Sequence, residues 1–198
     1  MLQSCPDDST RWMTASAPDA ITFRAARPDD AVCLGVLSTQ VFLDTYATQG
    51  IRRAVANEVL ALHSVAVYEA LLADPGVTIL VAECAGHLIG FSQVRDGAGD
   101  PQVAAAAASE LRRLYVQEPF TGRGIGRDLL RQAEKVAAAR GAEMLWLTAW
   151  EGNKRALQFY PRCGYEDLGA TVYTIEGEDY PNRVFGKRVR HVAMAAAQ

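Results

Sequence analysis

The residues with the clearest chemical potential form a glycine-rich turn, Gly122–Gly126, between a strand-like run that ends at Val116 and an amphipathic helix. The N-terminus of a helix carries free backbone N–H groups and partial positive charge, which together bind anions. Glycine lets a phosphate approach the backbone because no Cβ stands in the way. The order of strand, turn and helix therefore predicts a binding site for a diphosphate.

Three kinds of glycine-rich turn compete for this interpretation, and two of them do not fit. A Walker loop ends in Lys-Ser or Lys-Thr, and neither pair follows these glycines. The dinucleotide-binding pattern G-x-G-x-x-G, read from Gly122, requires a third glycine where Arg127 stands. The remaining pair is Gly124 and Gly126, followed by x-x-Leu-Leu. The plainer alternative is an ordinary turn with solvated arginines.

This third arrangement resembles the acetyl-CoA-binding core of the GNAT superfamily of N-acetyltransferases, whose pattern is Q/R-x-x-G-x-G/A. Thr121 stands where that family usually has Gln or Arg. Because the family contacts the diphosphate mostly through backbone N–H groups, the change is expected to weaken the site rather than remove it. Arg123 and Arg127 could supply positive charge instead.

A second motif between Met144 and Tyr165 resembles the same superfamily. It has a strand, an Asn, a helix with A-x-x-F-Y and a G-F/Y pair, at Asn153, Ala156, Phe159, Tyr160, Gly164 and Tyr165. Two linked motifs are far more specific than one glycine turn, and the resemblance spans about residues 21–192. It implies an N-acetyltransferase that uses acetyl-CoA and no metal. It also implies an α/β fold, with a mixed, twisted sheet of about seven strands and helices on both faces.

By the same resemblance, acetyl-CoA contacts the end of the strand before the turn, the turn itself and the last helix. The residues concerned are Leu114, Tyr115, Val116, Thr121, Gly122, Arg123, Gly124, Ile125, Gly126, Arg127, Asn153 and Tyr160. For Asn153 a plain N-cap role is also open, since Asn caps helices well.

Three residues are candidates for catalysis. The Val116 N–H would stabilise the oxyanion, and the Tyr160 hydroxyl would protonate the departing sulfur as general acid. Glu110 matches the base of histone-acetyltransferase members, and it shares a face of the strand with Val116 only if no bulge intervenes. Glu151 is the second candidate for the base. The plainer alternatives are a core aromatic for Tyr160 and a carboxylate paired with a neighbouring arginine for Glu110.

Two short runs suggest the acceptor. Val41–Tyr46 resembles T-F-x-D-T-F/Y of spermidine/diamine acetyltransferase-like members, and Trp150–Asn153 resembles their W-E-x-N. Asp44, Tyr46, Trp150 and Glu151 would then face the primary amine of a small molecule, polyamine-like amines included, which attacks directly in a ternary complex. The acidic residues of the last hairpin could add negative field, namely Glu176, Glu178 and Asp179.

Other interpretations of these acidic residues and of the function stay open. Asp44 could simply cap a helix, and the hairpin acids could be solvated turn residues. A peptide or protein N-acetyltransferase and a non-catalytic acyl-CoA-binding sensor are the alternative functions.

Composition limits the partners. The 198 residues carry a net charge of −3, with a pI near 5.6, which gives no electrostatic reason to bind nucleic acid. No apolar run approaches a membrane span of about 18 residues, and the N-terminus lacks the pattern of a signal peptide. The four cysteines and three histidines are scattered, which indicates reduced thiols in the cytoplasm and no metal site. A homodimer stays open.

The elements that must position these residues follow from periodicity and turn signals. We expect a loose arm over 1–20 and one domain over 21–192. Helices are expected at 28–44, at 52–73 with a break at His63-Ser64, at 125–140, closed by Gly141, and at 153–163. Strands are expected at 21–27, 77–83, 87–95, 110–116, 143–149, 168–175 and 184–192, the last two joined across an acidic turn.

Overall fold

The computed structural model describes residues 20–189, in which one seven-stranded sheet has the order β1-β2-β3-β4-β5-β7-β6. The expected arm up to residue 19 and the last expected strand residues, 190–192, lie outside the described residues, as do Cys5 and His191. The strands are β1 (Thr22–Ala25), β2 (Val77–Cys84), β3 (His87–Asp96), β4 (Ala108–Val116), β5 (Met144–Trp150), β6 (Glu166–Ile175) and β7 (Glu178–Arg188).

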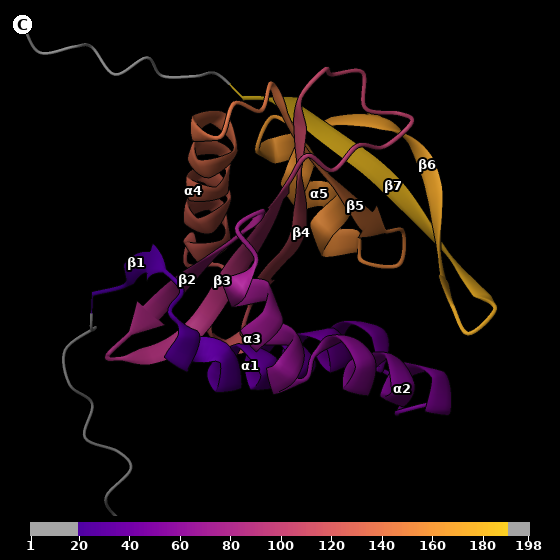
Figure 1. The fold of residues 1–198 in the computed structure, drawn as a ribbon. Helices are drawn as coiled ribbons and strands as arrows, with labels where there is room; N and C mark the ends of the chain where they lie inside the picture. The colour runs from indigo at the N-terminus through magenta and orange to yellow at the C-terminus, as the bar shows by residue number, and fades with distance from the viewer. Residues whose placement is uncertain (1–19, 190–198) are drawn as a thin grey trace, which may run out of the picture.

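Helices cover both faces of the sheet, as the sequence predicts (Figure 1). They are α1 (Ala31–Tyr46), α2 (Arg53–Leu62), α3 (Val65–Ala73), α4 (Ile125–Ala139) and α5 (Lys154–Arg162), with short 3-10 turns η1 (Pro28–Asp30) and η2 (Glu118–Phe120). On one face Leu34 of α1 and Tyr68 of α3 pack against Phe91. On the other face Leu130 of α4 and Tyr160 of α5 belong to one buried cluster. The expected mixed α/β architecture is therefore confirmed.

The long apolar stretch 53–73 ends and restarts at His63-Ser64, where the sequence predicts a break. By length and mean hydropathy of 1.3 this stretch of 21 residues could cross a membrane. It consists, however, of two helices of 10 and 9 residues, each much shorter than the roughly 20 residues of a span. We therefore interpret 53–73 as two short helices, α2 and α3, that pack against α1.

Two hairpins show how turn residues set strand length. Ala85 and Gly86 have φ values of 50° and 77° and join β2 to β3 in the expected place. The last hairpin differs from the prediction, because its turn is only Glu176-Gly177, with φ values of 45° and 84°. Two consecutive left-handed residues make a two-residue turn, so pairing resumes at once. Glu178 and Asp179, expected in the turn, are therefore the first residues of β7.

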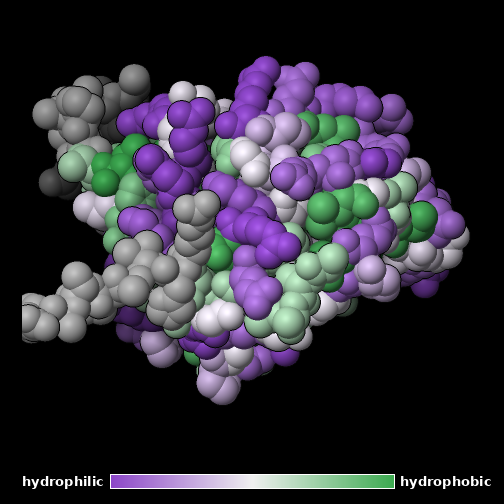
Figure 2. All heavy atoms as spheres, turned by 90° about the horizontal axis from the view of Figure 1, so that it is seen from above, coloured by the Kyte–Doolittle hydropathy of each residue, from purple (hydrophilic) through white to green (hydrophobic). Residues whose placement is uncertain are grey.

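The segment 97–107, for which the sequence indicates no role, lies across the β5–β7–β6 part of the sheet (Figure 1). Trp146 Nε1 donates to the Ala98 carbonyl at 2.8 Å, and Gln102 Nε2 donates to the Ala170 carbonyl at 2.8 Å. On the face shown in Figure 2, hydrophobic residues lie in separate patches among hydrophilic ones. The visible described residues of that face therefore form no continuous apolar surface of the kind that marks a large interface.

Candidate active site

A cavity of about 450 Å³ lies where β4, the glycine turn, α5 and α1 meet. We call the part formed by 120–127 the turn end, and the part formed by Val41, Thr45 and Tyr46 with the facing Tyr115 the α1 end. The lining comprises Val41, Thr45, Tyr46, Leu114, Tyr115, Val116, Phe120, Thr121, Gly122, Gly124, Ile125, Gly126, Arg127, Asn153, Arg155, Ala156, Phe159 and Tyr160. The sequence-predicted cofactor residues are thus brought together, except Arg123.

The cavity exists because β4 and β5 separate. Their parallel ladder joins only Ala108–Glu110 with Met144–Trp146. Beyond it, the Gln117 N–H donates to the Ile89 carbonyl at 3.0 Å, on the β3 side. Successive N–H groups of a strand point to opposite sides, so the Val116 N–H points toward the gap. A backbone donor therefore faces the cavity at the position expected for stabilising an oxyanion.

The turn end is built to receive an anion. Gly124 is the N-cap of α4 with φ of 84°, and no side chain caps this helix. The first N–H bonded back to the turn is that of Asp128, to the Gly124 carbonyl at 3.0 Å. The preceding N–H groups, of Ile125, Gly126 and Arg127, have no partner within the helix. A Cβ on Gly126 would lie 3.8 Å from Phe159 and 3.9 Å from Val116, so this bare backbone faces the cavity.

The charged and polar side chains near the glycine turn differ in whether they line the cavity or contact the loop itself. Arg127 lines the cavity, whereas Arg123 lies over the Phe120 ring, 5.6 Å from its centre. The Thr121 hydroxyl donates to the Glu118 carbonyl at 2.9 Å, so it stabilises the loop rather than replacing the longer side chain that is usual there. Of the two arginines expected to supply positive charge, Arg127 is the one that lines the cavity.

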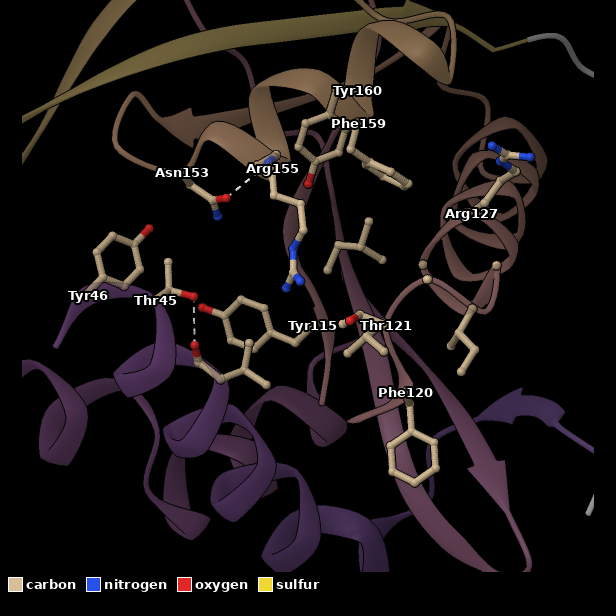
Figure 3. Close-up of a pocket in the computed structure, with 18 residues that line it drawn as sticks. Thr45, Tyr46, Tyr115, Phe120, Thr121, Arg127, Asn153, Arg155, Phe159 and Tyr160 are labelled. Carbon is tan, nitrogen blue, oxygen red and sulfur yellow. Dashed lines mark hydrogen bonds between the residues drawn. The ribbon is translucent and has the colours of Figure 1, made fainter. Parts of the chain in front are cut away.

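Arg155 is a lining residue that the sequence interpretation missed. It extends from α5 at the cavity (Figure 3) and bonds both oxygens of Glu118 on η2, at 3.1 and 2.9 Å. The same guanidinium lowers the pKa of Glu118. Its position two residues after the helix cap was the available signal. Val41, Thr45, Phe120, Ala156 and Phe159 are further lining residues absent from the predicted site.

Tyr160 lies in the cavity wall on α5, and its hydroxyl points into the cavity (Figure 3). Its ring packs against Phe159, Tyr165 and Phe185 and is 8% exposed. Burial raises the pKa of Tyr160, so the hydroxyl keeps its proton at neutral pH and can donate it. Asn153 caps α5, accepting the Ala156 N–H at 3.0 Å, and also lines the cavity, so both of its expected roles are compatible.

Glu110 is not brought to the cavity. Gln93 pairs with Arg113 but Val94 pairs with Leu111, so Arg112 is an extra residue in β4. This bulge makes Leu111 and Leu114 share the α4–α5 face and turns Glu110 away from it. Glu110 is 9% exposed and pairs with Arg112 at 2.8 Å. Burial raises its pKa, while the charge of Arg112 opposes the rise.

The predicted acceptor residues separate as well. Tyr46 lines the cavity, and Trp150 packs against it with ring centres 5.3 Å apart. Asp44 is exposed and Glu151 lies outside the lining, with its N–H bonded to the Pro181 carbonyl. In the described part of the chain, no group of three or more His, Cys, Asp or Glu residues could hold a metal ion.

Comparison with known proteins places this geometry in context. The acetyltransferase (GNAT) family model matches residues 44–165. An uncharacterized N-acetyltransferase of Mycobacterium bovis is 30% identical over 121 residues, which are 61% of this chain and 73% of that protein. An uncharacterized N-acetyltransferase of Lactobacillus delbrueckii subsp. lactis is 26% identical over 108 residues, 54% of this chain. That match spans 62% of the relative, less than two thirds of its length.

The fold is also similar to solved structures. The crystal structure of PaiA N-acetyltransferase from Thermoplasma acidophilum in complex with coenzyme A has a TM-score of 0.65 and 21% sequence identity. The match covers 85% of this chain and 99% of that one. At this identity the likeness concerns the fold.

Proposed function

The chain belongs to the acetyltransferase (GNAT) family, and from that premise we propose that it is an acetyltransferase that acetylates the primary amine of a small molecule. The observation that carries the proposal is the cavity itself. One continuous space joins an uncapped helix N-terminus, a free strand edge and the Tyr160 hydroxyl. These are the groups needed to bind a diphosphate, to position a thioester and to protonate a departing thiolate.

Acetyl-CoA fits the turn end on the evidence of the chain's own groups. Its diphosphate would accept hydrogen bonds from the N–H groups of Ile125, Gly126 and Arg127, where the helix dipole adds positive potential. Arg127 would add a charge-assisted contact. When bound, this cosubstrate supplies an acetyl group already activated as a thioester.

The residues at the gap between β4 and β5 would perform the transfer in a ternary complex. The Val116 N–H would donate to the oxygen on which negative charge develops, a contact worth about 3 kcal/mol in comparable sites. Tyr160 would donate its proton to the departing sulfur, since its raised pKa keeps the proton available. The two functions lie on different elements, so the cavity brings together donors from distant parts of the chain.

The general base stays a proposal between Glu110 and Glu151. Neither lines the cavity, so either carboxylate would act through intervening water. Glu110 is favoured by its chemistry, because a carboxylate whose pKa is raised toward neutral pH is a better proton acceptor at that pH. The position of Glu110 outside the cavity lining disfavours it as the base.

Thermal unfolding with three nucleotide ligands tests the cofactor assignment. Acetyl-CoA at about 100 times its Kd should stabilise the fold by roughly 2.7 kcal/mol, whereas NAD and ATP should not. Release of free thiol in the presence of a panel of amines then tests transfer. Equal stabilisation by ATP or NAD, or none by acetyl-CoA, would contradict the proposal.

Two arginines provide a matched pair for that experiment. Arg127→Gln removes the guanidinium of a residue that lines the cavity and should raise the Kd of acetyl-CoA by about fivefold to tenfold. Arg123→Gln removes one that lies over Phe120 outside the lining, and its effect should be clearly smaller.

A further inference from the structure

Within residues 20–189, no Asp or Glu lines the cavity, although its occupant is proposed to be an amine. Its charged residues are Arg127 and Arg155, both positive, and the remainder are apolar, aromatic, hydroxyl-bearing, amide or glycine residues. A cation with several charges therefore meets no counter-ion on these walls. Ammonium groups that lose water without a partner are strongly disfavoured.

Three carboxylates of α2 and the β6–β7 hairpin, near the α1 end, have other partners. Glu178 pairs with Arg52 at 2.8 Å, and Glu176 accepts a hydrogen bond from Asn57 at 2.6 Å. Glu58 accepts the Tyr173 hydroxyl. These contacts tie α2 to the β6–β7 hairpin, so these three acids link two elements, while Asp44 and Glu151 lie outside the cavity lining.

The α1 end has instead a continuous set of aromatic rings. Tyr46 contacts Phe42 with ring centres 4.6 Å apart and Trp150 at 5.3 Å, and Trp150 contacts Tyr180 at 6.2 Å. Tyr115 lies on β4 at the same end of the cavity (Figure 3). We call Tyr46, Trp150 and Tyr180 the aromatic wall. Only its first ring lines the cavity, so Tyr46 is the surface and the others support it.

The tyrosine hydroxyls at this end carry no charge at neutral pH. Burial raises the pKa of Tyr46, Tyr115 and Tyr160. These phenols can donate or accept a hydrogen bond, but they cannot neutralise an ammonium ion. The α1 end therefore suits a flat apolar body with one amine more than a flexible polycation.

We propose that the acceptor is a primary monoamine with an aromatic body, which stacks on Tyr46 while its amine reaches between Tyr115 and Tyr160. This inference rests on the acetyl transfer proposed above. The amine nitrogen bonds the acetyl carbon as the carbon–sulfur bond breaks, and the departing sulfur takes the Tyr160 proton. The nitrogen loses one proton through water to the general base, which releases it to solvent, and Tyr160 is reprotonated from solvent, so the products are an amide and a free thiol.

A substrate pair tests the inference directly. Phenethylamine and spermidine are compared as acceptors by thiol release at saturating acetyl-CoA. We expect kcat/KM to be at least about tenfold higher for phenethylamine, because its ring meets an aromatic surface and its one amine reacts. A higher kcat/KM for spermidine would overturn the inference.

Variants of the α1 end add a second measurement. Tyr46→Leu should raise the KM of phenethylamine about tenfold and leave the KM of acetyl-CoA unchanged, because the ring lies far from the glycine turn. Tyr173→Leu, a matched change at a tyrosine outside the lining, should leave both values within about twofold. An unchanged KM for phenethylamine in Tyr46→Leu would also overturn the inference.

The outcomes separate this inference from the proposed function. If acetyl-CoA stabilises the protein but phenethylamine is not acetylated, the acceptor class is wrong and the cofactor site stands. If acetyl-CoA neither binds nor reacts, the proposed function itself fails.

Discussion

The two ends of the cavity are built by different means. The turn end consists of one short segment, residues 120–127, and presents mainly backbone N–H groups. The α1 end takes side chains from α1 and β4, supported by rings of β5 and β7. A site made of backbone within one segment is fixed by local geometry, whereas a site made of distant side chains depends on the whole fold. The first kind should tolerate changes elsewhere, and the second kind should not.

The largest effect should come from the group that joins the two ends. Tyr160→Phe removes the hydroxyl that points into the cavity and keeps the ring that packs against Phe185. We expect kcat to fall at least tenfold, because a general acid typically contributes about 10²–10⁴ in rate. The Kd of acetyl-CoA, measured by calorimetry, should not change. An unchanged kcat would remove the acid role.

A change at Gly126 should act on the turn end alone. Gly126→Ala places a Cβ at ordinary contact distances of 3.8 and 3.9 Å, and Ala is the better helix former, so the fold should keep its stability. The added methyl occupies the surface that a diphosphate would approach, and we expect the Kd of acetyl-CoA to rise about tenfold. Gly99→Ala, in the 97–107 segment with open space around it, is the control and should bind normally.

A fall in pH should destabilise the packing of α1 against the α2–α3 junction, beneath the α1 end. His63 is buried against Phe42, and its Nδ1 lies 2.5 Å from the Ser38 hydroxyl oxygen. Burial and the charge of Arg113 lower its pKa to about 4. The unfolded chain, with an ordinary pKa near 6.5, then binds more protons between pH 6.5 and 4, so stability is lost as the pH falls through that window. Urea unfolding should show this loss in the wild-type protein.

The His63→Gln variant is the comparison for that measurement. It has no titrating group at this position, so its free energy of unfolding should fall less between pH 6.5 and 4 than that of the wild-type protein. An equal fall in both proteins would show that other groups cause the acid sensitivity.

The smallest effect is expected at Glu110. Its contribution to stability changes with pH in the direction opposite to that of His63. Because burial raises its pKa, the folded state holds the proton more tightly than the unfolded chain. The contribution of Glu110 to stability therefore declines as the pH rises through and above its ordinary range. Glu110→Gln should gain stability relative to the wild-type protein as the pH rises from about 4.5.

Kinetics of the same variant test the base role. If Glu110 acts as the base, the acidic limb of the pH–rate profile should disappear or shift in Glu110→Gln. An unshifted limb would exclude Glu110 and leave Glu151 as the candidate.

The sequence predicted most of the elements because their signals are local. The break at His63-Ser64, the Ala85-Gly86 turn and Gly141 after α4, with φ of 85°, each depend on a few adjacent residues. The last hairpin is confirmed, but its turn is shorter than predicted, because the acidic residues indicate a long turn whereas Glu176 adopts a left-handed conformation beside Gly177. A non-glycine residue at positive φ is uncommon enough that composition alone does not indicate it.

In the candidate site, too, features set by adjacent residues were predictable and features set by distant contacts were not. Of the cofactor residues predicted between Leu114 and Arg127, all except Arg123 line the cavity, since one strand, one turn and the start of one helix carry them. Glu110 was expected beside Val116, but the extra residue at Arg112 reverses its direction, and a bulge leaves no clear trace in a strand sequence. Arg155 was missed because its partner, Glu118, is far away in the sequence.

The short ladder between β4 and β5 has a consequence for the protein before it meets a ligand. Three paired positions hold these neighbours together, and past them β4 and β5 no longer pair with each other. Pantetheine contains two amides, which are chemically the same as the links of a polypeptide. A bound pantetheine arm would hydrogen-bond along β4 as a strand does and would fill the gap between β4 and β5. Amide hydrogen exchange at Leu114 and Val116, whose N–H groups lie on the side of β4 away from β3, should then slow on loading.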